Sequence, residues 1–256
     1  MPYSLSFCLK LIRTLPASAG DEHRALHAWV YHWLEAAEPK LAQFVHDQAE
    51  PKPFTVSPLT AEGDGRSHFR VTLLEDDYWQ YIERGMGRER TNRVLDRILA
   101  LDGPPQVTHK TYIELAQSTA TRREVILRFD SPTSFKSREK HYPLPDPMLV
   151  FESHHARWNA FAPDALKIDE AWSEWLANTV AVSRFELNSQ VVDFGSYQQI
   201  GCVGKAQYMT VGNGLDLEAG LGPFNALADY AFFCGTGHKT TQGMGQTRRV
   251  ASWAEV

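Results

Sequence analysis

Near its C-terminal end the chain reads Gly235-Thr236-Gly237-His238-Lys239-Thr240-Thr241-Gln242-Gly243-Met244-Gly245. Four glycines bracket a polar, basic loop, and glycine permits the positive φ angles that bring successive backbone N–H groups toward an anion. The pattern is compatible with a structural turn and with a phosphate-binding loop. It is neither a Walker A loop, which ends in Gly-Lys-Ser/Thr, nor a dinucleotide fingerprint, because a helix rather than a strand is predicted before it.

The residues upstream of this loop predict the element order β-α-β-β-α-β. The expected elements are a strand over residues 124–129, a helix over 148–161, strands over 180–187 and 197–211, a helix over 219–234 and a closing strand over 244–253. A proline-rich stretch at residues 143–147 gives a rigid connector before the first of these helices.

The first half of the chain predicts the same order. Its expected elements are a strand over residues 4–12, a helix over 21–37, a short helix over 39–45, strands over 51–59 and 68–74 around a turn at 63–65, a helical region over 76–101 with a break near 85–87, and a strand over 106–115. Two such units predict an α+β protein of two tandem ferredoxin-like (RRM-like) domains, with the glycine-rich loop before the last strand. We place these domains at residues 1–121 and 122–256; the repeat is one of topology, not of sequence identity.

Composition fits a globular protein of the cytoplasm. The 256 residues are 43% hydrophobic, carry 26 basic against 31 acidic side chains, and include three widely spaced cysteines. No window reaches the eighteen or so apolar residues that cross a bilayer, and Lys10 and Arg13 interrupt the apolar opening stretch where a signal peptide needs an unbroken core. The cysteines give neither a disulfide framework nor a zinc pattern.

The net charge of −5 argues against indiscriminate binding to nucleic acid, but basic residues are concentrated in two places. Residues 84–97 hold five arginines against two acids, and residues 235–249 hold three basic side chains and no acid. The five arginines are Arg84, Arg88, Arg90, Arg93 and Arg97. Each run is either a solvated face or part of an anion-binding surface.

Three residues of the first half are candidates for acid–base chemistry. Tyr31 falls about 140° from the apolar face of its predicted helix, so we expect it to point away from that helix's core. His46, at the end of the next short helix, can transfer protons near neutral pH. Lys52, which enters the following strand, can stabilise developing negative charge. Each also has a purely structural interpretation.

A metal site is not expected. His154 and His155 are adjacent, and adjacent residues of a helix point in different directions. The sequence shows no cluster of Asp, Glu or Cys that matches them.

Taken together, these features resemble the RAMP superfamily of CRISPR-associated proteins, and within it the endoribonucleases that cut precursor transcripts into guide RNAs. The loop fits the family pattern Gly-h-Gly-x5-Gly-h-Gly (h, hydrophobic) at all four glycines and at Met244, and departs from it at Thr236. The family's tyrosine, histidine and lysine fall on Tyr31, His46 and Lys52. Further familial stretches lie at residues 39–41, 52–59, 132–135, 144–151 and 157–159, so the resemblance covers nearly the whole chain.

The resemblance implies a metal-independent endoribonuclease without cofactor, acting on CRISPR repeat RNA. In that family the 2′-hydroxyl attacks the adjacent phosphorus and leaves a cyclic phosphate and a 5′-hydroxyl. His46 and Tyr31 would share the proton transfers, in an order that stays open, and Lys52 would stabilise the phosphorane. The RNA-binding candidates are Gly235, Gly237, His238, Lys239, Gly243, Gly245 and the five arginines.

Two alternatives remain at this point. RAMP relatives use the same fold to hold guide RNA without cutting it, as subunits of effector complexes. An unrelated cytosolic enzyme could instead use the glycine-rich loop to bind a small phosphorylated ligand. The resemblance places the protein in a prokaryotic cytoplasm. It leaves open the cognate repeat, the cut position, other effector subunits as partners, and homodimer formation.

Overall fold

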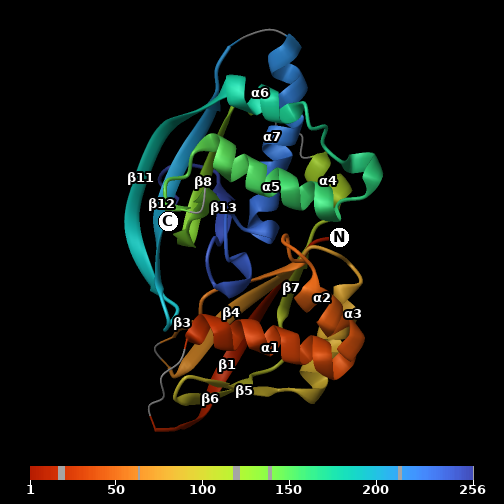
Figure 1. Cartoon of the computed structure of the whole chain (residues 1–256), viewed down its shortest axis with the longest axis vertical. Coiled ribbons are helices and arrows are strands. Elements are labelled where there is room, and N and C mark those ends of the chain that lie inside the picture. The colour runs from red at the N-terminus through yellow and green to blue at the C-terminus, as the bar shows by residue number, and fades with distance from the viewer. Residues whose placement is uncertain (17–20, 63, 118–121, 138–139, 213–214, 256) are drawn as a thin grey trace. The chain divides into compact units, whose positions relative to one another are not determined.

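A computed structural model describes residues 1–16, 21–62, 64–117, 122–137, 140–212 and 215–255 (Figure 1). The chain forms two compact units. Unit 1 comprises Met1–His109, Asp193–Gln199 and Thr241–Gly243, and unit 2 comprises Lys110–Val192, Ile200–Thr240 and Met244–Val256. The first segment of unit 1 thus ends at His109, whereas the sequence prediction placed the domain boundary after residue 121. Residues 118–121, and residue 63 of the predicted turn, lie outside the described part of the chain.

Unit 1 is built on an antiparallel sheet around its first strand. The strands are β1 (Tyr3–Thr14), β2 (Phe54–Val56), β3 (Thr60–Ala61), β4 (Arg66–Leu73), β5 (Thr91–Val94), β6 (Arg97–Leu101) and β7 (Gln106–His109). They are arranged in the order β2-β4-β1-β6-β5, with β3 paired to β4 and β7 paired to β1. The β1 strand therefore pairs with β4 on one side and with both β7 and β6 on the other.

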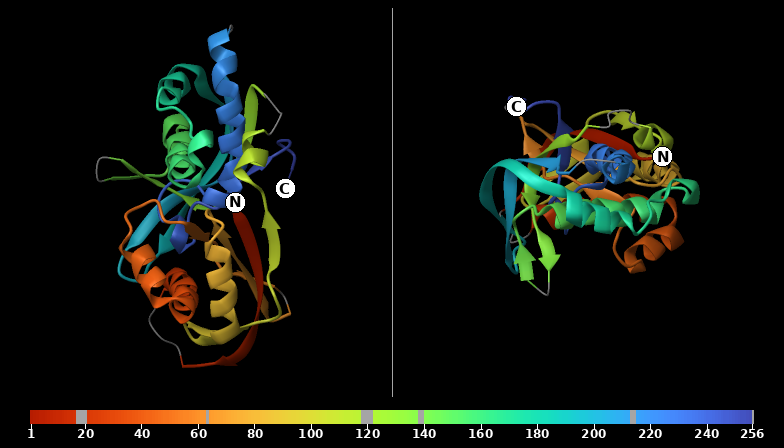
Figure 2. Two further views of the ribbon diagram at one scale, coloured as in Figure 1. Left: turned by 90° about the vertical axis from the view of Figure 1, so that its right-hand side faces the viewer. Right: turned by 90° about the horizontal axis from the view of Figure 1, so that it is seen from above.

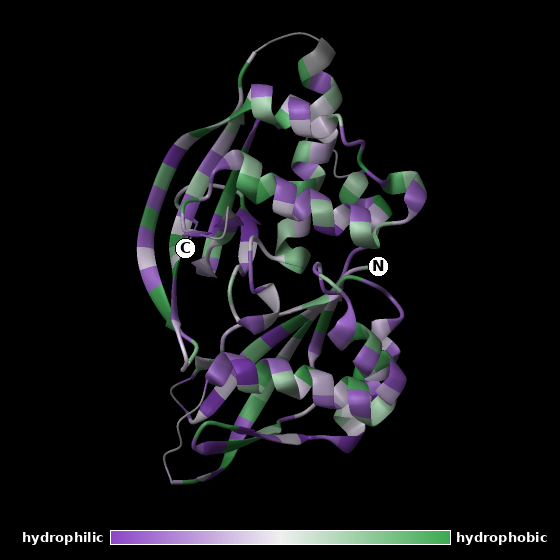
Figure 3. Cartoon of the chain, in the orientation of Figure 1, coloured by the Kyte–Doolittle hydropathy of each residue, from purple (hydrophilic) through white to green (hydrophobic). Residues whose placement is uncertain are grey.

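The helices of unit 1 are α1 (Glu22–Ala37), α2 (Pro39–Asp47) and α3 (Tyr78–Arg88). Hydrophobic and hydrophilic residues alternate along α1 (Figure 3), and the buried face of this helix packs on the sheet. The Trp33 indole lies 5.1 Å, centroid to centroid, from Phe7 of β1. In Figure 2, α1 and α3 lie on the same side of β1. Gly85 of α3 permits the close approach to α1, because a Cβ there would lie 2.0 Å from the Trp33 carbonyl oxygen.

The sequence prediction of a helical region over residues 76–101 is wrong in its second half. The α3 helix ends at Arg88, and the chain continues as the β5–β6 hairpin, which turns at Leu95 with a φ of 55°. The hairpin forms because β6 completes the sheet beside β1, a long-range pairing that local periodicity does not reveal. Similarly, the strand predicted over 106–115 ends at His109, and a capping box at Thr111 starts helix α4 (Tyr112–Ala116).

Unit 2 contains a four-stranded sheet in the order β11-β12-β8-β13. Its strands are β8 (Glu124–Thr133), β11 (Val180–Asp193), β12 (Gln198–Thr210) and β13 (Thr247–Val250), with a separate hairpin of β9 (Phe135–Ser137) and β10 (Lys140–Tyr142). Its helices, besides α4, are α5 (Pro147–Phe161), α6 (Trp172–Thr179) and α7 (Leu215–Cys234), with 3₁₀ turns η1 (Asp164–Leu166) and η2 (Thr240–Gln242). The sequence did not predict α6 or the small hairpin.

The core of unit 2 lies between its sheet and helices α5 and α7. Phe151 of α5 contacts Tyr208 of β12 and Phe224 of α7, at ring distances of 5.3 and 4.9 Å. Each unit therefore repeats the β-α-β-β-α-β order with antiparallel strands, and the prediction of two tandem ferredoxin-like units is confirmed. Within the described residues, no helix is both long and apolar enough to cross a membrane.

Candidate active site

Helices α1 and α2 bring Tyr31 and His46 together in unit 1. Tyr31 is not among the fully buried residues of α1, and its half-buried side chain packs against the core of unit 1. Its ring lies 5.8 Å from the imidazole of His46, at an interplanar angle of 69°. Phe54, the first residue of β2, is buried against Tyr31 at a ring distance of 5.5 Å. The two candidates are thus neighbours over an apolar base.

A second histidine, His27, belongs to the same cluster. Its ring lies 4.9 Å from Tyr31 and 5.8 Å from Phe54. The His27 Nδ1 lies 3.0 Å from the carbonyl oxygen of Thr241, which can only accept, so Nδ1 carries the proton and Nε2 keeps its lone pair. Burial lowers the pKa of His27, which favours this neutral form. Our sequence prediction missed His27 as a catalytic candidate; its i, i+4 spacing to Tyr31 is the signal that could have indicated it.

The His46 side chain is exposed and pairs with its own neighbour. Its Nδ1 lies 3.3 Å from Oδ1 of Asp47, and both side chains are largely solvent-accessible. Hydrogen bonds from Gln43 and His46 lower the pKa of Asp47, so this carboxylate is ionised and accepts a hydrogen bond from Nδ1–H of His46. The other ring nitrogen of His46 is then available to a substrate.

The Tyr31 hydroxyl is a proton donor at neutral pH. Burial, and then the nearby negative charge of Glu50, raise the pKa of Tyr31 to about 12. A phenolate is therefore not available near pH 7. The hydroxyl can still donate a hydrogen bond.

Lys52 is engaged at the C-terminal end of α2. Its ammonium donates to the carbonyl oxygens of Val45 at 2.7 Å, of His46 at 2.8 Å, and of Gln48. A cation in this position stabilises the negative end of the helix dipole. The structure thus brings Lys52 to the backbone of His46, where its charge adjoins the Tyr31–His46 pair.

The glycine-rich loop of residues 235–245 is organised by hydrogen bonds within itself and to neighbouring residues of unit 2. Its four glycines have φ angles of 66 to 81°, and a Cβ at Gly237 would lie 2.4 Å from the Ser134 carbonyl oxygen. Backbone N–H groups donate to protein acceptors: Thr236 to Gly245 O, Gly237 to Ser153 Oγ, His238 to Ser134 O, and Gly245 to Pro132 O. These N–H groups are therefore committed to the fold, and an anion at this loop depends chiefly on side chains such as Lys239.

The five candidate arginines do not form one helical stripe. Arg84 and Arg88 lie on α3, whereas the other three lie after it, in or beside the β5–β6 hairpin. Arg97 forms an ion pair with Glu22 at 2.7 Å, and the Arg84 guanidinium lies 4.8 Å from the ring centroid of Tyr81. Arg88, Arg90 and Arg93 donate to backbone carbonyls. Except for Arg97, all are exposed.

His154 and His155 have structural partners inside unit 2. The Nε2 of His154 lies 2.7 Å from Thr236 Oγ1, and that of His155 lies 3.1 Å from the Ile168 carbonyl oxygen. Across the described ranges, no group of three His, Cys, Asp or Glu side chains could hold a metal ion.

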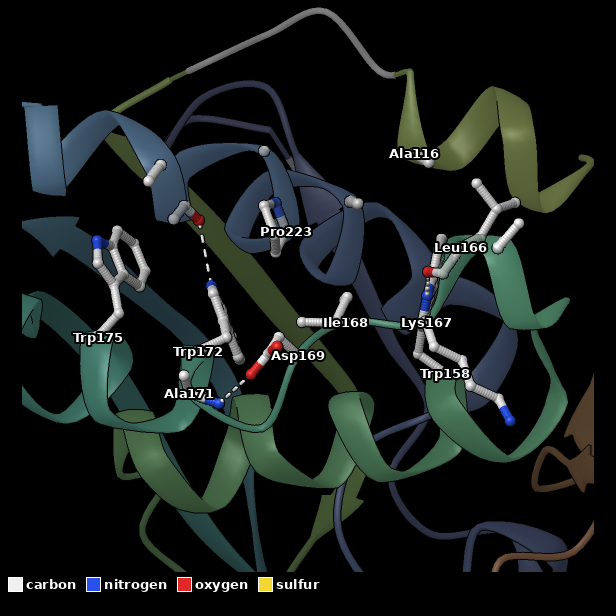
Figure 4. A pocket seen from close by; sticks show the side chains of 15 residues that line it. Ala116, Trp158, Leu166, Lys167, Ile168, Asp169, Ala171, Trp172, Trp175 and Pro223 are labelled. Atoms are coloured by element: carbon white, nitrogen blue, oxygen red, sulfur yellow. Dashed lines mark hydrogen bonds between the residues drawn. The ribbon is translucent and has the colours of Figure 1, made fainter.

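Unit 2 also has an apolar pocket of about 490 Å³ on its helical side (Figure 4). The indoles of Trp172 and Trp175 line it, together with Pro223 of α7 and Ile168. The lining contains no histidine or tyrosine, so it does not provide the acid–base groups found in unit 1.

Two ferredoxin-like units, a glycine-rich loop before the last strand and a Tyr–His pair on the first two helices define a RAMP-type protein. Two family models match the sequence: the CRISPR Cas6 N-terminal domain over residues 1–99, and the CRISPR-associated endoribonuclease Cas6 over residues 127–247. The chain belongs to the Cas6 family. A search of curated proteins finds no match.

Solved structures agree with this assignment over nearly the full length. A Cas6 product complex from Thermus thermophilus has a TM-score of 0.83 and 25% identity, covering 98% of this chain and 99% of that one. A second Cas6 product complex has a TM-score of 0.78 and 28% identity, covering 98% and 100%. A Cas6-related protein from Pyrococcus furiosus, with 11% identity, a TM-score of 0.65 and coverage of 98% and 100%, shares the fold.

Proposed function

We propose that this protein is a metal-independent endoribonuclease that cuts CRISPR repeat RNA in a precursor transcript to give guide RNAs. The observation that carries the proposal is the cluster of His27, Tyr31 and His46 beside the ammonium of Lys52. The family assignment supports the substrate class, and the two Cas6 product complexes among its structural relatives support RNA as the ligand.

The reaction needs a base, an acid and a positive charge. The 2′-oxygen of the nucleotide before the cut forms a new bond to the adjacent phosphorus as its proton passes to the base. The bond from phosphorus to the 5′-oxygen then breaks, and that oxygen takes a proton from the acid. The products are a 2′,3′-cyclic phosphate and a 5′-hydroxyl, with no water or cofactor consumed.

We assign the base to His27 and the acid to His46. His27 is neutral, and its Nε2 lone pair is available because Nδ1 is bonded to Thr241. His46 is exposed, and its Nδ1 lies 3.3 Å from Oδ1 of Asp47, which leaves the other ring nitrogen facing the substrate. Tyr31, protonated near neutral pH, donates a hydrogen bond to a phosphate oxygen. Lys52 contributes positive charge and holds the His46 backbone in place.

For RNA binding we propose the half-buried part of the glycine-rich loop, chiefly His238 and Lys239, and the exposed arginines of unit 1. The 2′-hydroxyls and phosphates of an RNA hairpin are recognised by shape and charge, and cationic side chains suit that mode. Arg97 is the weakest member of the set, because Glu22 already neutralises it.

The test is incubation of the protein with end-labelled repeat RNA in excess EDTA, followed by analysis of the product ends. The proposal predicts a single cut with a cyclic phosphate and a 5′-hydroxyl. Cleavage that appears only after a divalent metal is added would contradict metal independence. Tight binding with no cut under any condition would instead support the alternative, a guide-RNA-binding RAMP subunit.

A further inference from the structure

Arg157 of α5 is a buried cation that has only neutral hydrogen-bond partners within the part of the chain that the structure describes. The exposed fraction of Arg157 is only 8%. The guanidinium donates to the carbonyl oxygens of Ser153 at 2.9 Å and Gly237 at 2.7 Å, and lies 3.5 Å from Thr240 Oγ1. Among the described residues, no carboxylate lies within ion-pair distance of it. Buried arginines are rarely left in this state, because desolvation of the charge is costly unless an anion compensates it.

The groups around this guanidinium are neutral. Burial, and then the charge of Arg157 itself, lower the pKa of His154 to about 3, so the imidazole is uncharged. Burial raises the pKa of the Cys234 thiol to about 12. The C-terminal end of α7, at Cys234, supplies only partial negative charge. None of these groups therefore neutralises the full positive charge of Arg157.

Arg157 contacts the loop at Gly237 and Thr240, and the residues between these two contacts are among the more accessible ones of the loop. Gly237 and Lys239 are half-buried, whereas Gly235 and Gly245 on the flanks are buried. Lys239 has a φ of 59°, in the left-handed region that residues with a Cβ seldom adopt. Such strain persists only where the surrounding structure imposes it. Arg157, bonded to Gly237 and close to Thr240, fixes the backbone on both sides of Lys239.

We propose that Arg157 is a positioning residue for an RNA backbone phosphate. It holds the loop in place through its contacts with Gly237 and Thr240, and the phosphate neutralises its uncompensated charge. This inference rests on the proposed function, because it takes the ligand to be repeat RNA. Arg157 acts through Gly237–Thr240 and is not itself in the reaction.

The test measures repeat-RNA affinity across a salt series for the full chain and three variants. Arg157→Met removes the charge, and Arg157→Lys keeps the charge but cannot bridge the same acceptors. Asn159→Ala is the control, because Asn159 lies on the same helix as Arg157 and the substitution removes its hydrogen bonds to Ile168 without changing charge. Neutralising one phosphate contributes about 0.7–0.9 to the slope of log K against log salt.

We expect Arg157→Met to bind repeat RNA about tenfold more weakly at low salt. Its slope of log K against log salt should be smaller by about 0.7–0.9, the contribution of one phosphate. Arg157→Lys is expected to keep the slope, and Asn159→Ala to keep both affinity and slope. A slope for Arg157→Met equal to that of the unaltered protein would overturn the inference and leave the proposed function standing. Unaltered protein that fails to bind the RNA would overturn the proposed function, and the inference with it.

If Arg157→Met does not fold, the pair Thr240→Asp and Thr240→Asn replaces it. The two substituents differ only in charge, and the aspartate supplies the missing carboxylate beside Arg157. We expect Thr240→Asp to melt at a higher temperature than Thr240→Asn but to bind RNA more weakly and with a smaller salt slope. Equal salt slopes for the two variants would contradict the inference.

Discussion

The imidazoles of His27 and His46 both lie within ring contact of Tyr31 and differ in environment. We predict that His27→Ala and His46→Ala each lower the single-turnover cleavage rate by about 10²- to 10⁴-fold, the usual contribution of a general acid or base. Repeat-RNA affinity should change little. His32→Ala, an exposed histidine of the same α1 helix, is the matched control. A His27→Ala variant that cleaves at the rate of this control would remove His27 from the mechanism.

The buried His154 makes stability depend on pH. Its pKa is about 3 in the folded protein and near 6.5 when unfolded, so the unfolded chain binds the extra proton and acid favours unfolding. Its contribution is fully present above pH 6.5. It is lost at about 1.4 kcal/mol per pH unit as the pH falls toward 3.

Urea unfolding of the unaltered protein and of His154→Gln at several pH values measures this contribution. We predict that the free energy of unfolding falls less steeply with decreasing pH in the variant. His27, whose pKa is also lowered, contributes in the same direction in both proteins and so does not obscure the difference. Parallel pH profiles for the two proteins would show that His154 accepts a proton without unfolding.

The burial of a single residue was predictable where it depends on the face of the helix that the residue occupies. The angle of Tyr31 from the apolar face of α1 agrees with its absence from the fully buried residues of that helix. It did not show that the half-buried ring packs against the core of unit 1. The role of His27 depends on the Thr241 carbonyl oxygen, 214 residues away in the sequence, and no local pattern reveals that contact.

Among the elements, α2 depends on Lys52 at its C-terminal end. We predict that Lys52→Met lowers the free energy of unfolding by about 1–2 kcal/mol, because the last carbonyl groups of the helix lose a charged donor. The cleavage rate should fall as well, since His46 sits in this last turn. Lys40→Met, an exposed lysine in the first turn of α2, should change neither quantity. Unchanged thermal stability in Lys52→Met would show that the three contacts are dispensable.

A further prediction concerns the glycines of the loop of residues 235–245. Gly237→Ala places a Cβ against Ser134 at a φ of 77°, and we expect it to destabilise the protein by about 1–2 kcal/mol or more. Gly222→Ala, in helix α7 with no atom within 4 Å of the added Cβ, should be neutral or stabilising. Differential scanning calorimetry of both variants distinguishes the two sites. Equal melting temperatures would contradict the steric explanation of the loop pattern.

The elements that the sequence predicted well include those whose periodicity reflects a single buried face, such as α1 and β8. The β5–β6 hairpin was missed because the strand that β6 pairs with, β1, lies about 90 residues earlier in the chain, and tertiary pairing overrode the helical pattern. The glycine spacing indicated a loop of unusual backbone geometry. It could not show that the N–H groups of that loop are used inside unit 2.

At the scale of the whole molecule, the repeated β-α-β-β-α-β order was predictable because elements such as α1 and β8 bury residues with the period of a helix or a strand. The net charge of −5 gave no sign of an RNA ligand. The local arginines and the uncompensated Arg157 point to one, and they occur in different units. Charge distribution rather than net charge is therefore the informative quantity here.

The central claim is that the 2′-hydroxyl of the RNA is the nucleophile and that this cluster moves its proton. The most direct measurement compares single-turnover cleavage, in excess EDTA, of repeat RNA with the same RNA carrying one 2′-deoxy nucleotide before the cut. We predict that the deoxy substrate binds with unchanged affinity and is not cleaved. Cleavage of the deoxy substrate at a comparable rate would contradict the mechanism, because it would require water or another group as the nucleophile.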